Sequence, residues 1–454
     1  MSLDLPTAPT DIAVHTTEQL EAAISAAVQA LPSWRGTAPA ERAERLSRAA
    51  ADVRADAEGL GRLLSGTTGR LLGEATSSAL VAAELLEEAA ATVLSGGGRA
   101  LSGGPLNLDA VRFEPRGLVA VITPWNDPYP AAAGLLGAAL ATGNVVVHKP
   151  SERSSAPGVA LARHLVAHLP DGVLGVVEGG PEDGAALASD PRVDVIAHIG
   201  STAAGRAIAE AAGRNGIRVI RENGGKDALV VDAGVDPAWA AGQIAEGAFT
   251  NAGQLCTSVE RVFVHESIHD RVVDELVRAA EALRPGDPTD ETTTLARLVD
   301  ERQLAVVMSH VDDAVVRGAS CLTGGRRFEP DGLWFAPTVL TDCTTDMLVM
   351  REETFGPVAP VMAVGSFEEA LELANTGRYG LAATVLTPDM DHALRAAAVL
   401  DVGTVKINAV FGGAPAGSAD PRRDSGSGCG FGPELFRELT AAKAVHIEAA
   451  PVRT

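Results

Sequence analysis

The amino-acid sequence predicts an α/β protein built from two domains with parallel sheets. Short β-branched runs alternate with Ala/Leu-rich helical segments through most of the 454 residues, a pattern typical of βαβ units. A chain of this length exceeds one ordinary hydrophobic core and is expected to divide into two or more domains. In proteins of this kind, ligands commonly bind between the domains.

The first hundred residues predict helices followed by a hairpin. From Thr17 to about Leu94, apolar and charged residues recur every three or four positions, which indicates successive amphipathic helices. Gly and Thr residues in Leu60–Gly73 are expected to interrupt them. Glycine-rich segments at 95–98 and 102–105 then punctuate the chain, and Leu106–Phe113 alternates like a strand in one arm of a projecting hairpin.

The rest of the chain alternates between strands and helices. In the first series, strands are expected at Gly117–Thr123, Asn144–His148, Gly175–Val177, Val195–His198 and near Val219, with helices from Tyr129, over Pro157–His168 and from Thr202. A second series runs from Ala228 to Val405, with strands near Leu229, Val262, Val361 and Val405.

One uncharged stretch, Tyr129–Val147, is nearly long enough to span a membrane. Several glycines and a turn at Thr142-Gly143-Asn144 interrupt it, so a buried helix followed by a buried strand is predicted instead.

Composition excludes several classes of function. The formal net charge of −22 offers no basic stripe for nucleic acid. The four cysteines show neither CxxC nor Cys/His ligand spacing, so we expect no metal site and reduced thiols. The first basic residue is Arg35, so no charged region precedes an apolar segment as in a signal peptide. We therefore expect a cytoplasmic protein without a membrane partner.

Cys256 stands apart from the other cysteines because of its neighbours. A lone cysteine is most often an inert small hydrophobe, but the run Asn251-Ala252-Gly253-Gln254-Leu255-Cys256 is small and polar. Glu222 opens the run Glu222-Asn223-Gly224-Gly225-Lys226, and Asn126 follows Pro124-Trp125. A thiol, a carboxylate and an amide are the nucleophile, base and oxyanion donor that attack on a carbonyl requires.

These three runs resemble the motifs of the aldehyde dehydrogenase superfamily, and Glu222 precedes Cys256 by the family's usual 34 residues. The resemblance implies that the Cys256 thiolate attacks an aldehyde while Asn126 and the Cys256 N–H hold the oxyanion. It also implies that Glu222 activates the water that releases a carboxylic acid from a covalent thioester. Without the resemblance, Glu222 would be interpreted as a surface carboxylate and Asn126 as a turn residue.

The resemblance also implies an NAD cofactor. The run Lys149-Pro150-Ser151-Glu152 matches the family's ribose-binding segment, and a carboxylate at Glu152 would accept the ribose 2′-hydroxyl and repel a 2′-phosphate. NAD is thus favoured over NADP, which remains possible. The glycine turn Gly200–Gly205 precedes a predicted helix that would face the pyrophosphate. The cofactor residues implied are Thr123, Trp125, Lys149, Ser151, Glu152, Gly200, Ser201, Gly205, Gly224, Glu353 and Phe355.

The sequence departs from the family's pattern along the expected substrate tunnel. Asp127 and Gly134 stand where the family usually has bulky apolar residues, and Leu135 replaces a common lysine. These changes predict a wide tunnel with a carboxylate near its throat, suited to a bulky, polar or cationic aldehyde. Alternatively, Arg422 and Arg423 could contact an anionic substrate. The tunnel residues implied are Asp127, Ala131, Gly134, Leu255, Thr257, Gly413 and Ala419.

The family's architecture predicts two Rossmann-like α/β domains with parallel sheets and a small β oligomerisation flap. Residues 1–97 and 115–224 are assigned to the dinucleotide-binding domain, 225–433 to the catalytic domain, and 98–114 with 434–454 to the flap. The exposed strands of the flap imply a homodimer or homotetramer. Two alternatives remain open: a CoA-acylating aldehyde dehydrogenase, and a catalytically silent binding or structural member of the fold.

Overall fold

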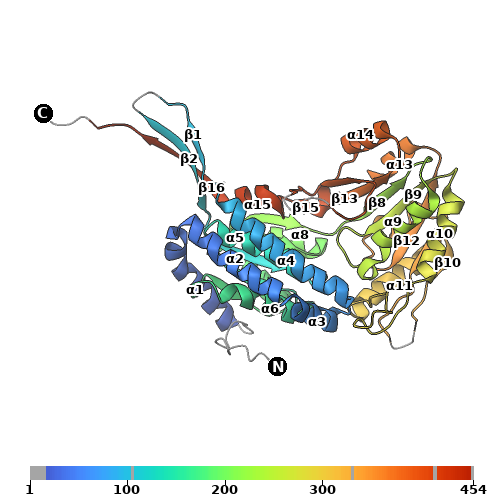
Figure 1. Ribbon diagram of the computed structural model, residues 1–454, viewed down its shortest axis with the longest axis horizontal. Coiled ribbons are helices and arrows are strands. Elements are labelled where there is room, and N and C mark those ends of the chain that lie inside the picture. The colour runs from blue at the N-terminus through green and yellow to red at the C-terminus, as the bar shows by residue number, and fades with distance from the viewer. Residues whose placement is uncertain (1–16, 104–106, 329–331, 413–416, 451–454) are drawn as a thin grey trace.

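The computed structural model describes residues 17–103, 107–328, 332–412 and 417–450, and its mixed α/β architecture confirms the predicted fold class. The strands of these residues form three sheets. Two large sheets lie in separate lobes, and a small sheet projects from the first lobe as a ribbon (Figure 1).

The first lobe contains a six-stranded sheet in the order β15-β7-β6-β3-β4-β5. Its strands are β3 (Leu118–Thr123), β4 (Val145–Pro150), β5 (Leu174–Val176), β6 (Val195–Ile199), β7 (Arg218–Glu222) and β15 (Gly426–Ser427). All pairs are parallel except β15 with β7. Every residue of β3 and β4 is buried, which explains their continuous β-branched runs, because both faces of a parallel sheet are covered.

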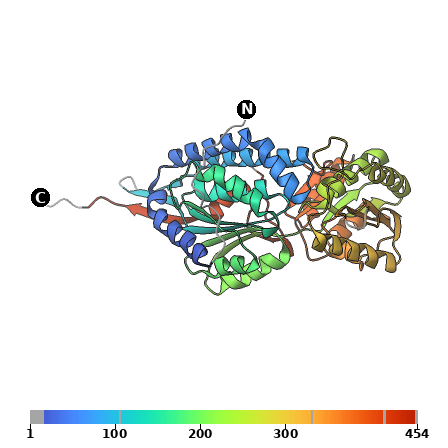
Figure 2. The same ribbon diagram turned by 90° about the horizontal axis from the view of Figure 1, so that it is seen from below.

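Helices cover both faces of this sheet. They are α1 (Thr17–Gly36), α2 (Pro39–Ala55), α3 (Ala57–Thr68), α4 (Leu72–Val93), α5 (Pro128–Ala141), α6 (Ser155–Val166), α7 (Pro181–Ser189), α8 (Thr202–Gly213) and α15 (Gly432–Glu438). In Figure 2 the blue helices α2 and α4 lie above the sheet and the light green α8 lies below it. The stretch interpreted as a buried helix and strand is α5 followed by β4, and almost all of its side chains are buried.

The second lobe contains a seven-stranded sheet in the order β10-β11-β12-β9-β8-β13-β14. Its strands are β8 (Asp227–Val231), β9 (Val259–His265), β10 (Ser320–Thr323), β11 (Thr338–Thr341), β12 (Val358–Val364), β13 (Ala382–Leu386) and β14 (Thr404–Ile407). Only β10 with β11 is antiparallel among these pairs. The helices of this lobe are α9 (Pro237–Phe249), α10 (His269–Glu281), α11 (Glu301–Val316), α12 (Leu348–Arg351), α13 (Phe367–Ala374) and α14 (Met390–Val399).

The projecting ribbon consists of β1 (Arg99–Leu101), β2 (Leu108–Pro115) and β16 (Thr440–Ile447). Strand β2 lies in the middle and pairs antiparallel with both neighbours, and its register sets Val111 opposite Ala444. The hairpin predicted near Leu106–Phe113 is therefore present and is joined by the C-terminal strand.

Two boundaries predicted from sequence are wrong. Helix α3 runs through most of Leu60–Gly73, and the interruption is confined to Gly69–Leu71, where Gly69 has a φ of 81°. The six-stranded sheet also takes β15 from within 225–433, because the chain returns to the first lobe before its last helix. Leu435 and Leu439 then pack in the core of that lobe.

Asn144 joins three parts of the first lobe and is completely buried. Its Oδ1 accepts from the Gly117 backbone N–H at 2.9 Å, and its Nδ2 donates to Thr142 Oγ1 at 2.8 Å and to the Leu439 carbonyl at 3.1 Å. The same amide therefore fixes the start of β3, the turn after α5 and the start of β16.

Asn144→Ala is expected to lower the free energy of unfolding by at least about 2 kcal/mol, because it leaves the Gly117 N–H without a partner and leaves the Leu439 carbonyl with only the Arg116 N–H, at 3.4 Å. Urea unfolding at a fixed protein concentration measures this change. The control is Asn107→Ala, which removes one exposed bond to Glu448 and should change stability by less than about 0.5 kcal/mol. Equal stability of the two variants would contradict the role given to Asn144.

Candidate active site

A cavity of about 610 Å³ lies between the two lobes, at the carboxyl ends of β3, β4, β6 and β7. This is the edge at which open α/β sheets bind their ligands. The cavity brings together the three predicted catalytic residues, Cys256, Glu222 and Asn126. It is also lined by the predicted cofactor residues Thr123, Trp125, Lys149, Ser151, Glu152, Gly200, Ser201, Gly224, Glu353 and Phe355.

Cys256 follows a loop whose backbone is strained. Asn251, Ala252 and Gly253 all have a left-handed φ, of 49°, 54° and 70°, and only glycine adopts this region at low cost. A side chain at Gly253 would collide with the Gly356 carbonyl. The loop therefore lies directly against the segment that carries Glu353 and Phe355.

Gln254 holds this loop in place and is almost completely buried. Its side-chain amide donates to the carbonyls of Asn251 at 2.9 Å and Arg297 at 3.1 Å, and its Oε1 accepts from the Val299 N–H at 2.9 Å. Sequence analysis did not single out Gln254 as a structural residue. These three hydrogen bonds stabilise the left-handed backbone of the loop, which the chain would not adopt without them.

The Asn126 amide, which comes from the first lobe, is attached to the same loop. Its Nδ2 donates to the Gln254 carbonyl at 3.0 Å, and the residue is only 6% exposed. One N–H of that nitrogen is used by this bond, which leaves the second free to donate into the cavity. The bond fixes the amide beside the nucleophile loop across the boundary between the lobes.

The paired glycines after Glu222 make room for the rest of the site. A side chain at Gly224 would collide with the Glu353 carboxylate, and one at Gly225 would meet the Cys256 carbonyl at 2.9 Å. In the structure the two glycines let two other parts of the active site approach the strand end that carries Glu222.

Burial sets the protonation of the site. It raises the pKa of Glu222 to about 7. Burial, followed by the nearby carboxylates of Glu222, Asp227 and Glu353, also raises the pKa of Cys256 above that of an ordinary thiol. The thiolate expected from sequence is therefore not the resting form at neutral pH, and the thiol needs a base to remove its proton.

A buried ion pair supports the Glu353–Phe355 segment. Lys226 Nζ lies 2.7 Å from Glu260 Oε2, and both side chains are at most 5% exposed. The Glu260 carboxylate accepts from the backbone N–H groups of Thr354 at 2.8 Å and Phe355 at 2.7 Å. This support allows Phe355 to keep a φ of 54°. Sequence analysis missed Glu260 because it lies far from Glu353 in the chain.

Contacts between aromatic rings and an arginine join the two lobes beside the predicted cofactor residues. The rings of Trp125 and Phe355 meet edge to face with centroids 5.5 Å apart, and the Arg153 guanidinium lies 4.4 Å from the Trp125 ring. Arg153 also pairs with Asp300 in the second lobe at 2.7 Å. Arg153 was not predicted, although it directly follows Glu152.

The far end of the cavity carries the predicted ribose and phosphate residues. Lys149 Nζ and Glu152 Oε2 lie 3.8 Å apart, and Ser201 caps α8 by accepting from the Ala204 N–H at 3.3 Å. Gly205 does not line the cavity. A side chain there would collide with the amide of Asn223, whose Nδ2 donates to the Asp424 carbonyl at 2.9 Å.

The tunnel residues differ most from the expectation. Asp127 and Ala131 line the cavity, whereas Leu255, Thr257 and Ala419 do not, and Gly413 lies outside the described residues. The Asp127 carboxylate is not free for a cation, because it pairs with Arg70 at 2.6 Å. The space beside Gly134 is not open either.

A Phe431 side chain occupies that space. A carbon added at Gly134 would lie 2.7 Å and 2.9 Å from two atoms of the Phe431 ring, and Phe431 itself lines the cavity. The space predicted beside Gly134 is therefore taken up by Phe431, a residue far away in the chain. Leu135, which replaces the family's lysine, is buried in the core of the first lobe.

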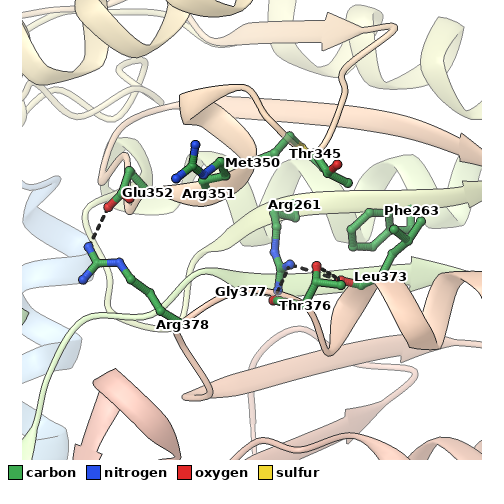
Figure 3. Close-up of a pocket in the computed structure, with 10 residues that line it drawn as sticks. All are labelled: Arg261, Phe263, Thr345, Met350, Arg351, Glu352, Leu373, Thr376, Gly377 and Arg378. Carbon is green, nitrogen blue, oxygen red and sulfur yellow. Dashed lines mark hydrogen bonds and ion pairs between the residues drawn. The ribbon is translucent and has the colours of Figure 1, made fainter.

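A second cavity of about 400 Å³ lies in the second lobe and shares no lining residue with the cavity that contains Cys256 (Figure 3). Arg261 donates to the backbone carbonyls of Lys226, Leu373, Ala374 and Thr376. Arg378 pairs with Glu352 at 2.6 Å. The Arg261 guanidinium thus holds the end of α13 and the turn that follows it. No cysteine lines this cavity.

Among residues 17–103, 107–328, 332–412 and 417–450, no three His, Cys, Asp or Glu side chains form a group able to hold a metal ion. Within the same ranges, no helix is both long and apolar enough to cross a membrane.

Comparison with known proteins agrees with this geometry. The model of the aldehyde dehydrogenase family matches residues 7–445. The chain is 36% identical over 446 residues to the betaine aldehyde dehydrogenase of Cereibacter sphaeroides, a match that covers 95% of this chain and 90% of that protein. It is 38% identical to retinaldehyde dehydrogenase 3 of Mus musculus over 74% of this chain and 66% of that protein.

Among solved structures, the NAD-dependent aldehyde dehydrogenase of Sinorhizobium meliloti superposes with a TM-score of 0.93 at 34% identity, over 97% of this chain and 89% of that one. The chain therefore belongs to the aldehyde dehydrogenase family, and its reaction is the NAD-dependent oxidation of an aldehyde to a carboxylic acid.

Proposed function

We propose that Cys256 is the nucleophile, Glu222 the base and Asn126 an oxyanion donor in this reaction. The observation that carries the proposal is that a thiol, a carboxyl group and a side-chain amide from three distant segments line one cavity. Glu222 takes the thiol proton as the sulfur bonds to the aldehyde carbon. The free N–H of Asn126 and the Cys256 backbone N–H then stabilise the oxyanion of the thiohemiacetal.

Glu222 acts again when the acid is released. NAD, when bound, accepts the hydride that leaves the aldehyde carbon. Glu222 first releases the thiol proton to solvent, then removes a proton from water as the water oxygen bonds to the thioester carbon, and the carbon–sulfur bond breaks with its electron pair on the sulfur. A carboxylate with a pKa near 7 is well matched to both proton transfers at neutral pH.

The cofactor end of the cavity suits NAD. The N-terminus of α8 opens at Gly200 and Ser201, where backbone N–H groups favour a pyrophosphate. Lys149 and Glu152 would hold the adenosine ribose, and Glu152 disfavours a 2′-phosphate, so NAD is preferred over NADP. Thr123, Trp125, Ser151, Gly224, Glu353 and Phe355 would complete this part of the site. Titration with both cofactors tests the preference, and tighter binding of NADP would contradict it.

We also propose a cytoplasmic homodimer or homotetramer formed through the flap. Strand β16 is the outer strand of the ribbon, so one edge of its backbone is left open. Leu101, Leu108 and Ile447 on the ribbon are 44%, 55% and 53% exposed, more apolar surface than an isolated ribbon would usually present. All four cysteines are free thiols, which agrees with a reducing compartment.

Light scattering of the purified protein is expected to give the mass of a dimer or a tetramer. Deleting residues 440–454 removes β16 and should reduce the mass to that of the monomer. A monomeric full-length chain, or an oligomer unaffected by the deletion, would contradict the role of the flap.

Cys256→Ala is expected to abolish NADH formation while NAD still binds, because the cavity keeps its shape and loses only the nucleophile. The matched control is Cys321→Ala, which changes an exposed thiol in the second lobe and should retain full activity. NADH formation by the Cys256 variant would contradict the proposal, and absence of NADH from the unchanged chain would favour the catalytically silent alternative.

The activity is expected to rise with pH through about 7, because Glu222 must be deprotonated to accept a proton. Glu222→Gln should lower kcat at least about 100-fold and remove this inflection. The control Glu368→Gln changes an exposed carboxylate and should keep the wild-type profile.

An unchanged pH profile in the Glu222 variant would contradict the assignment of the base. Formation of acyl-CoA in place of the free acid, when CoA is added, would instead support the CoA-acylating alternative.

A further inference from the structure

Asp127 faces the cavity as half of an ion pair, not as an isolated charge. Its Oδ1 accepts from Arg70 Nη1 at 2.6 Å and also from the Ser78 hydroxyl. The Arg70 side chain is only 8% exposed, whereas that of Asp127 is 31% exposed. The carboxylate is therefore anchored on one oxygen by α4 and the turn before it, and Asp127 lines the cavity.

The charge of this carboxylate is offset in part before any substrate arrives. The guanidinium of Arg70 pairs with Asp127 and also lies 3.5 Å from Glu74, so two carboxylates share one cation. Burial opposes the charge on Arg70, but the carboxylates of Asp127 and Glu74 outweigh burial and hold the pKa of Arg70 above its usual value. A cationic substrate would compete for Asp127 with a buried guanidinium that cannot leave, so this carboxylate selects a cation less strongly than an isolated charge would.

The second oxygen of Asp127 still needs a hydrogen-bond donor. Both bonds from the protein go to Oδ1, and among the described residues no donor is recorded for Oδ2. An ionised carboxylate has acceptor sites on both oxygens. Asp127 directly follows Asn126 in the chain and shares a cavity with Cys256, so a donor that satisfies Oδ2 would belong to the molecule bound at the nucleophile.

The apolar side of the same region is narrowed by Phe431. Its ring occupies the space above Gly134, and Pro130 and Ala131 from the first turns of α5 line the cavity with it. A substrate would therefore meet one aromatic surface and one fixed acceptor. That combination suits a compact carbon skeleton bearing a hydroxyl group.

We propose that the substrate is an uncharged hydroxyaldehyde, that Asp127 Oδ2 accepts a hydrogen bond from its hydroxyl, and that Phe431 contacts its carbon skeleton. Arg70 and Ser78 are positioning residues that aim the carboxylate. The inference rests on the proposed function, because it concerns the aldehyde that Cys256 attacks. It narrows the bulky, polar or cationic aldehyde expected from sequence to one that is polar and uncharged.

Steady-state rates of NADH formation with glyceraldehyde and propionaldehyde test the proposal, because the two have the same number of carbons and differ in their hydroxyl groups. The kcat/KM for glyceraldehyde should be at least about tenfold higher, since loss of a partner leaves a desolvated carboxylate oxygen unpaired. Betaine aldehyde and succinic semialdehyde represent cationic and anionic substrates. A higher kcat/KM for either one, or no preference for glyceraldehyde over propionaldehyde, would overturn the inference.

Asp127→Asn should lower kcat/KM for glyceraldehyde at least about tenfold and change that for propionaldehyde by less than about threefold. An equal loss for both aldehydes would show a merely structural role and overturn the proposal. The triple variant Arg70→Met/Glu74→Gln/Asp127→Leu removes the guanidinium together with both carboxylates that it pairs with, so that no charge of this group is left unpaired if the single variant fails to fold. It should also lose the difference in kcat/KM between glyceraldehyde and propionaldehyde while keeping its affinity for NAD.

Ser78→Ala is the matched control for the positioning network, because it removes one of the two bonds to Oδ1 and leaves the Arg70 pair intact. Its loss of glyceraldehyde preference should be smaller than that of Asp127→Asn. Phe431→Ala should raise the relative kcat/KM for benzaldehyde, and an unchanged ratio would contradict the contact. No NADH from any aldehyde would contradict the proposed function itself, whereas NADH without a hydroxyl preference contradicts only this inference.

Discussion

The active site depends on the strained nucleophile loop and on the buried side chain that holds it. Three successive residues, Asn251 to Gly253, have a left-handed backbone, and such a run is unstable unless its surroundings enforce it. Gln254 supplies that enforcement through bonds to the loop and to the segment around Arg297. Its own carbonyl then receives the Asn126 amide. One residue thus holds the loop that precedes Cys256 and accepts a hydrogen bond from the other lobe.

The protonation of Cys256 depends on the acidic side chains that are buried around it. Glu222, Asp227 and Glu353 all have a pKa raised by burial, and each in turn disfavours a negative charge on Cys256. A permanently ionised sulfur would be costly in this environment. The site is better described as a protonated thiol beside a base that titrates near neutrality, so charge separates only when a carbonyl is present to accept the electron pair.

The sequence predicts the fold class correctly, and it also predicts three residues that the structure brings to one cavity, because both predictions depend on local signals. Alternating strands and helices reveal βαβ units, and Cys256, Glu222 and Asn126 each stand in a short, distinctive run. The missed features are contacts between distant segments. Glu260 supports Phe355 across 95 positions, and β15 returns to the first sheet after the whole second lobe. No periodicity or motif encodes which of two sheets a two-residue strand will join.

The substrate region shows why single departures from a family pattern mislead. Gly134 alone suggests extra space, but Phe431 fills it from a segment almost three hundred positions later. Asp127 alone suggests an attraction for cations, but Arg70, 57 positions earlier, already pairs with it. In both cases a change in shape or charge is matched by a second residue, because a close-packed interior does not tolerate an isolated void or an unpaired charge. Specificity therefore has to be inferred from the pair, and the pair is visible only when the chain is folded.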